Sequence, residues 1–121
     1  MTEKNTVAAS LDKSKAQTIL RSVPYSRGFH FFTAVGNYTG ETAIDLFAFY
    51  EELKAIENEA VSFHFPRRDF QNWVKDTLGD IELANRIDGI APQQSVEGLK
   101  KELVQVVEAR LTELHTAAND P

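Results

Sequence analysis

Residues 44–56 read Ile44-Asp45-Leu46-Phe47-Ala48-Phe49-Tyr50-Glu51-Glu52-Leu53-Lys54-Ala55-Ile56. One stripe of apolar side chains recurs there at helical spacing, made by Leu46, Phe49, Tyr50, Leu53 and Ile56. A second set widens this stripe and leaves only a narrow polar strip: Ile44, Phe47 and Ala48. We predict a helix from about residue 41 to residue 57, capped by Thr39 or Thr42. A helix this apolar belongs at the centre of a core, so we expect the rest of the fold to be built around it.

The chain on the N-terminal side predicts one more helix and then an extended segment. The helix covers residues 11–23, with Ser10 as its cap. Residues 28–35 (Gly-Phe-His-Phe-Phe-Thr-Ala-Val) are instead aromatic and favour a strand. A turn signal at Gly36-Asn37 is followed by residues that suit a return strand. We therefore predict a short strand or hairpin over residues 28–39.

The chain on the C-terminal side predicts further helices. Residues 58–65 fit either a strand, because their apolar positions alternate, or a short helix capped by Asn58, which we favour. Three more helices follow, each marked by a residue at its start, a glycine stop or both. They are residues 69–78 (Asp69 as cap or first-turn residue, with Gly79 as the stop), the segment between Asp80 and Gly89, and a last helix from Ser95 to about Ala117.

The last helix is long for a domain of this size. It would extend about 35 Å at about 1.5 Å per residue, whereas a chain of this length folds into a globule about 27 Å across. Its C-terminal end would then project and expose Leu111 and Leu114. A second copy of the chain could bury these leucines in a homodimer, or the first helix of the same chain could pack there.

The expected fold class is mainly α: a compact bundle of four or five helices with a short N-terminal β strand or hairpin. An α+β fold is the alternative. A chain of 121 residues with 42% hydrophobic residues can bury one core, so we expect a single globular domain over residues 10–117. Residues 1–9 are expected to form a disordered tail.

Composition excludes several classes of function. The chain has no cysteine, which removes disulfides, thiolate nucleophiles and cysteine zinc sites. The longest apolar run, residues 46–50, is far shorter than the ~20 residues of a membrane span, and residues 1–10 lack a signal-peptide core. We therefore expect a cytoplasmic protein with no membrane segment. The net charge of −5 disfavours nucleic-acid binding, because an acidic chain repels phosphate backbones.

Two histidines that lie between phenylalanines are the candidates for chemistry. His30 and His64 could form an acid–base pocket or a facial metal site together with Asp69. No ligand pair has the i, i+4 spacing of a helical zinc motif, so we expect no metal. The chain also lacks a Gly-x-Ser-x-Gly elbow, a Walker loop and a Gly-x-Gly-x-x-Gly turn. We therefore expect no cofactor, and these three side chains are catalytic candidates only if the chain is an enzyme.

One connected motif runs through residues 64–84: His64-Phe65-x-x-x-Asp69-Phe70-x-x-Trp73-Val74, followed by Leu78-Gly79-Asp80-x-x-Leu83-Ala84. Together with the upstream Phe29-His30-Phe31 and Thr39-Gly40, it resembles a family of small uncharacterised prokaryotic domains of unknown function. The resemblance spans about residues 28–90. It implies no activity, cofactor or partner.

The motif has a structural and a functional interpretation. In the structural one it is a corner between two helices, in which Asp69 accepts amide hydrogen bonds and the aromatic residues share one buried face. In the functional one, Arg67, Arg68 and Trp73 form a partner-binding edge with His64, since arginine and tryptophan dominate binding hot spots.

These observations favour a non-enzymatic protein-interaction or regulatory adaptor module with a protein partner. The alternative is a small ligand-binding or hydrolytic enzyme that uses a pocket formed by His30, His64 and Asp69. Nucleic-acid binding through Arg67 and Arg68 is the least favoured hypothesis.

Overall fold

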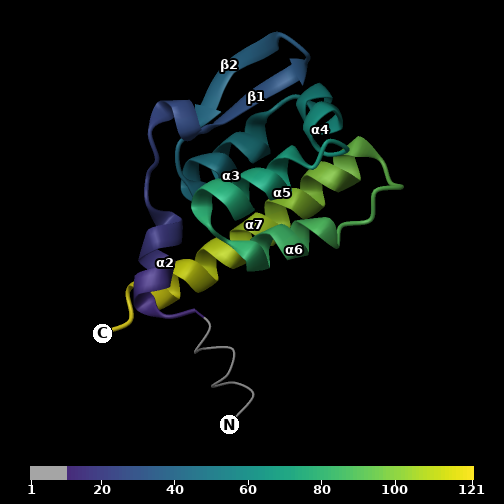
Figure 1. Cartoon of the computed structure of the whole chain (residues 1–121). Coiled ribbons are helices and arrows are strands. Elements are labelled where there is room, and N and C mark those ends of the chain that lie inside the picture. The colour runs from purple at the N-terminus through teal and green to yellow at the C-terminus, as the bar shows by residue number, and fades with distance from the viewer. Residues whose placement is uncertain (1–10) are drawn as a thin grey trace.

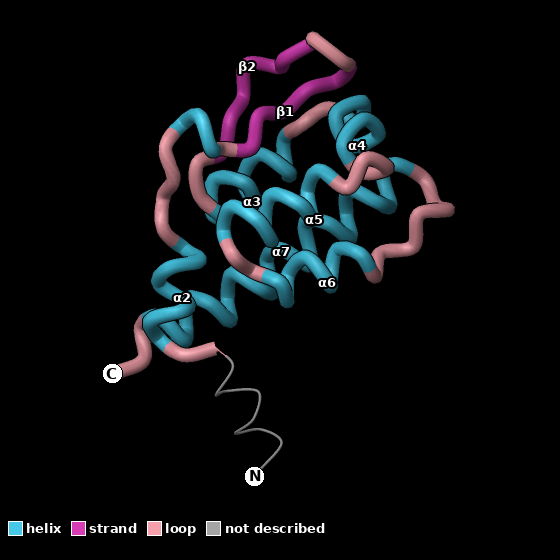
Figure 2. Tube along the Cα trace, viewed as in Figure 1, coloured by secondary structure: helices cyan, strands magenta, loops and turns pink. Residues whose placement is uncertain are grey.

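A computed structural model describes residues 11–121 and contains six α-helices with one antiparallel β-hairpin (Figure 1, Figure 2). The elements in chain order are α2 (Lys13–Leu20), a 3₁₀ turn η1 (Tyr25–Arg27), β1 (Phe29–Ala34), β2 (Asn37–Ala43), α3 (Leu46–Ala55), α4 (Asn58–His64), α5 (Asp69–Trp73), a π-helical turn η2 (Val74–Leu78), α6 (Ile81–Asp88) and α7 (Val96–Ala118). The prediction of a mainly α fold with an N-terminal hairpin is confirmed, with six helices in the described residues rather than four or five. The predicted tail, residues 1–9, and the predicted cap Ser10 lie outside the described residues.

The longest helix, α7, packs against most of the bundle. It contacts α2, α3, α4 and α6. Figure 1 shows it running behind α3 and α5 toward the C-terminus, with α2 beside its last turns. The hairpin lies on the opposite side of the molecule from α2, above α3 and next to α4. None of the helices in residues 11–121 has the length and the apolar composition needed to span a bilayer.

Helix α3 is buried at the centre of the bundle, as the sequence predicts, but it is shorter than predicted. The carboxylate of Asp45 caps it by accepting the N–H of Ala48 at 2.8 Å, so the helix begins at Leu46. Residues 41–43, which we predicted to be helical, belong to β2 and pair with β1. The buried stripe of the helix is Leu46, Phe49 and Leu53.

Two of the residues predicted to widen this stripe face solvent instead. Ile44 and Phe47 are both exposed, and Phe47 is exposed by more than half. Helix α3 contacts α7, β2 and α2, and the ring of Phe49 packs against aromatic rings of β1 and α5. These neighbours leave the flank with Phe47 exposed. The helix is therefore amphipathic, with one covered face.

Leu111 and Leu114 are buried within the chain, at 5% and 0% exposure. Helix α2, which Asp12 caps through the N–H of Lys15, packs against α7. Of the two alternatives for the last helix, the structure therefore has the second, in which the first helix of the same chain covers the apolar stripe. The C-terminal end of α7 therefore does not expose these leucines, and the reason for expecting a homodimer through them is absent. Helix α2 of the same chain packs against α7 where a second copy was expected to pack.

The segments after α3 follow most of the predicted caps and stops, but the predicted cap Asn58 is the first residue of α4, and Glu57 takes the cap position without a side-chain hydrogen bond. α4 adopts the helical alternative for residues 58–65. Gly79 stops the following turn in the left-handed conformation, at φ 85°. Asp80 and Ser95 cap α6 and α7, and each accepts a backbone N–H at 3.1 Å. α5 begins after Arg68, which also has a left-handed backbone, at φ 63°.

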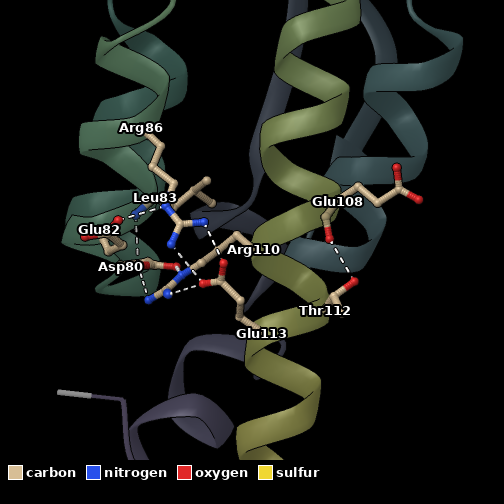
Figure 3. Close-up of polar contacts among 8 residues, drawn as sticks. All are labelled: Asp80, Glu82, Leu83, Arg86, Glu108, Arg110, Thr112 and Glu113. Atoms are coloured by element: carbon tan, nitrogen blue, oxygen red, sulfur yellow. Dashed lines mark hydrogen bonds and ion pairs between the residues drawn. The ribbon is translucent and has the colours of Figure 1, made fainter. Parts of the chain in front are cut away.

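A buried ion pair joins the start of α6 to α7 (Figure 3). Arg110 donates from Nε and Nη2 to the two carboxylate oxygens of Asp80, at 2.9 and 3.0 Å, and both side chains are almost fully buried. Glu113 extends the network toward the surface, accepting from Arg110 and from Arg86 at 2.9 Å each. Since Asp80 also caps α6, one carboxylate serves both the helix start and the ion pair.

We expect Arg110→Met to lower the free energy of unfolding by about 3–5 kcal/mol, because it leaves the Asp80 carboxylate buried without its partner. Urea denaturation at neutral pH measures this loss. Arg86→Met is the matched control, because its carboxylate partners are partly exposed. We expect the control to lose about 1 kcal/mol or less.

A double variant separates the charge from the packing. Asp80→Asn keeps a side-chain oxygen that can cap α6 and removes the negative charge. Asp80→Asn combined with Arg110→Met should therefore be more stable than Arg110→Met alone. If the double variant is the less stable of the two, an unpaired buried carboxylate does not explain the loss.

Candidate functional site

A pocket of about 410 Å³ lies between the hairpin, α4 and the turn that joins α4 to α5. Its walls are mainly aromatic, and polar side chains from both of the Phe-His-Phe segments and from the turn reach it. We name it the hairpin pocket, and its lining residues are Gly28, Phe29, His30, Phe32, Val35, Gly36, Phe63, His64, Arg67 and Asp69.

The imidazole of His64 joins α4 to strand β1 and to the first residue of α5. The backbone N–H of Phe32 donates to Nε2 at 2.9 Å. Nε2 must therefore carry the lone pair, and the ring proton lies on Nδ1, which donates to Asp69 Oδ2 at 2.9 Å. Since His64 is only 3% exposed, neither nitrogen is left for a metal ion or a substrate.

Burial determines the charge of His64. Removal from solvent lowers the pKa of its imidazole below the ordinary value of 6.5, and the neighbouring Asp69 carboxylate offsets only part of this effect. The rings of Phe29 and Phe63 lie edge-on, with centroids 4.8 and 5.0 Å from the imidazole. The ring is therefore neutral at neutral pH, in the one tautomer that satisfies both hydrogen bonds.

Arg67 lies at the rim of the hairpin pocket. Its Nε donates to Asp69 Oδ2 at 3.0 Å, and its guanidinium carbon lies 4.6 Å from the centre of the Phe63 ring. About half of the side chain is exposed, and its terminal nitrogens make no hydrogen bond to any described residue. The guanidinium is thus held in place at Nε and over the ring while its outer donors remain available.

His30 reaches the same pocket but is bonded elsewhere. Its Nδ1 lies 2.7 Å from Thr42 Oγ1, and it makes no hydrogen bond to His64 or Asp69. Thr42 in turn lies 2.6 Å from the hydroxyl of Tyr38, in an exposed cluster that includes Tyr25. The sequence did not predict this cluster, whose members come from η1, β1 and β2.

The predicted edge of Arg67, Arg68 and Trp73 is not a single surface. Arg68 points to α6, where its Nη1 and Nη2 donate to Asp88 at 2.6 and 3.2 Å. Trp73 is buried, and its indole N–H donates to the carbonyl of Arg27 at 2.9 Å. Of the three side chains, only Arg67 lines the hairpin pocket.

The apolar lining residues Phe32, Val35 and Phe63 were not singled out from the sequence. The only indication of these residues in the sequence was the aromatic or alternating apolar pattern of residues 28–35 and 58–65. That pattern is equally typical of residues in a hydrophobic core. Within residues 11–121, no group of three or more His, Asp or Glu side chains is placed to hold a metal ion. What the pocket offers chemically is an apolar hollow with a cation at its rim.

The described residues thus form a small helical domain with an aromatic pocket under its hairpin. Residues 66–120 match the model of a family described as Family of unknown function (DUF5752). The match covers just under half of the chain, from the turn before α5 to the end of α7, and begins two residues after His64. The resemblance to a family of unknown function is confirmed over this part. No curated protein and no solved structure matches the chain.

We expect the free energy of unfolding to fall as the pH is lowered from about 7 to about 5, in part because of His64. In the unfolded chain this imidazole binds a proton below a pH of about 6.5, whereas burial lowers its pKa in the folded chain. Acid therefore favours the unfolded state: the contribution is fully present above pH 6.5 and is lost as the pH falls through the folded pKa. Urea denaturation across this range should show a weaker decline for His64→Gln than for the wild type.

His115→Gln is the control for this measurement, because His115 is exposed in the last turns of α7. Its stability should decline with pH as that of the wild type does. Parallel declines in the wild type and His64→Gln would show that burial of a neutral imidazole does not cause the pH dependence.

Proposed function

We propose that the chain is a non-enzymatic protein-interaction module, of the adaptor or regulatory kind, whose docking site is the hairpin pocket. One observation carries the proposal: the pocket combines apolar walls with an arginine at its rim, while its buried imidazole is engaged at both nitrogens. An imidazole in that state cannot take a proton from a substrate without breaking the bonds that hold the hairpin. The groups that remain available are suited to binding.

The surface around the pocket favours an extended protein segment as the occupant. A second hollow, of about 560 Å³, lies next to the first, and Val35 and Phe63 line both. Val35 is at the hairpin turn and is 86% exposed. Two hollows in a row, separated by two apolar side chains, suit successive side chains of one bound segment.

The charge at the rim supports a segment that carries an acidic residue. The outer nitrogens of Arg67 make no hydrogen bond to a described residue, and the side chain is held by Asp69 and the Phe63 ring. A guanidinium held in this way can receive a carboxylate through two hydrogen bonds. We therefore propose a partner segment with an apolar side chain in the pocket and an acidic side chain next to it.

The test is affinity capture from a lysate of the source cells, combined with a photo-crosslinking side chain at position 35. We expect the wild type to retain one protein in stoichiometric amount and the crosslinker to attach to that protein. Val35→Asp and Arg67→Ala should each lower its recovery by about tenfold or more, as expected for hot-spot residues. Circular dichroism and thermal melts establish that each variant is folded.

Ile81→Asp is the matched control, because Ile81 is another exposed apolar residue, at 62%, and lies on α6 outside the two hollows. It should retain the partner as the wild type does. Equal loss with Ile81→Asp, or crosslinking at position 35 to no protein, would contradict docking at the hairpin pocket.

Small-ligand binding or hydrolysis is a second candidate, because His30, His64 and Asp69 do line one pocket. His30 would have to be the acting base, since its Nε2 makes no hydrogen bond to a described residue. A metabolite that co-purifies with the wild type and with Val35→Asp, but is lost from His30→Gln, would favour this candidate over protein docking.

A further inference from the structure

We infer that a third cavity, between the α4–α5 turn and the loop joining α6 to α7, binds an uncharged organic ligand with an apolar body and an N–H or O–H donor. The cavity has a volume of about 590 Å³ and shares no lining residue with the hairpin pocket. We name it the loop pocket. Its volume lies within the range of small-molecule sites.

A buried amide with an unpaired oxygen lies in the wall of the loop pocket. Gln71 is only 5% exposed, and its Nε2 donates to Asp88 Oδ1 at 3.1 Å. Its Oε1 has no hydrogen-bond partner among the described residues and is out of reach of solvent. The amide cannot be turned around, because Oε1 would then face a carboxylate that can only accept. Buried polar atoms without a partner are rare in folded proteins, so this acceptor is suited to a donor supplied by a ligand.

A strained residue stands next to this amide. Arg68 has a left-handed backbone at φ 63°, a conformation that few residues other than glycine adopt. Strain of this kind is concentrated at functional sites. Here it directs the Arg68 guanidinium onto Asp88, whose Oδ1 accepts from Arg68 at 2.6 Å as well as from Gln71. The guanidinium and the amide therefore lie side by side at one carboxylate oxygen.

The charges and the floor of the loop pocket define the class of ligand. Arg68 and Asp88 neutralise each other through two hydrogen bonds. The polar wall of the pocket therefore has no net charge that a charged ligand would have to balance. The rest of the lining includes the buried apolar residues Phe65, Ile90 and Leu99. Since Oε1 is buried, binding of the ligand requires side chains of the pocket wall to move so that the donor reaches this oxygen.

The test is titration of the full chain with benzamide, followed in ¹H–¹⁵N spectra through the side-chain amide of Gln71 and the Nε–H of Arg68. We expect benzamide at millimolar concentration to shift both signals. Methyl benzoate has a similar shape but no donor, and it should bind about tenfold more weakly or not at all. The Trp73 indole signal, which reports on the bond to Arg27 beside the hairpin pocket, should not move.

Two variants complete the test. Gln71→Met removes the unpaired oxygen together with the Nε2 bond to Asp88 and keeps the apolar bulk, so it should abolish benzamide binding, and a thermal melt establishes that it is folded. Gln105→Met is the control, because Gln105 is exposed on α7 and does not line the pocket. Equal binding of benzamide and methyl benzoate would overturn the inference. So would Gln71 side-chain signals that benzamide leaves unmoved, since the unpaired oxygen would then be satisfied by a buried water alone.

Discussion

The imidazole of His64 holds the hairpin against the helical bundle by accepting the N–H of Phe32 and donating to Asp69. A two-stranded hairpin is marginally stable by itself, so it needs such support from the helices. The indole N–H of Trp73 adds a second link, to the carbonyl of Arg27 just before β1. Because both links run from helical side chains to the backbone next to or within β1, they determine how far the hairpin lies from α4 and α5. The walls of the hairpin pocket depend on that separation.

The turn between α4 and α5 places its two arginines at two different cavities. Arg67 and Arg68 are adjacent in sequence, and a single surface patch was the simplest expectation. The left-handed backbone of Arg68 turns its side chain toward Asp88, while Arg67 stays over Phe63. Each arginine therefore borders a different cavity. The hairpin pocket and the loop pocket share no lining residue, and a substitution at one arginine need not affect the other.

The segment that matches the family of unknown function has its own internal framework. Residues 66–120 contain the buried pair of Asp80 and Arg110, which connects the start of α6 to α7. They also contain Arg68, Gln71 and Asp88, the polar wall of the loop pocket. Most of the hairpin pocket comes from residues before this segment. The loop pocket thus belongs largely to the matched part of the chain, and the hairpin pocket largely to the part that precedes it.

The sequence by itself determined the helical class of the fold and most helix ends, because caps and stops act within a few residues. Asp80 and Ser95 cap helices where their positions indicated, and Gly79 ends one. Only the tertiary structure decided that α2 would cover Leu114, that residues 41–43 would pair with β1 instead of extending α3, and that Trp73 would be buried. The convergence of His30, His64 and Asp69 on one pocket was conceivable from their residue types but could not be derived. Such outcomes depend on which apolar faces pack together, and those faces come from segments that are far apart in the chain.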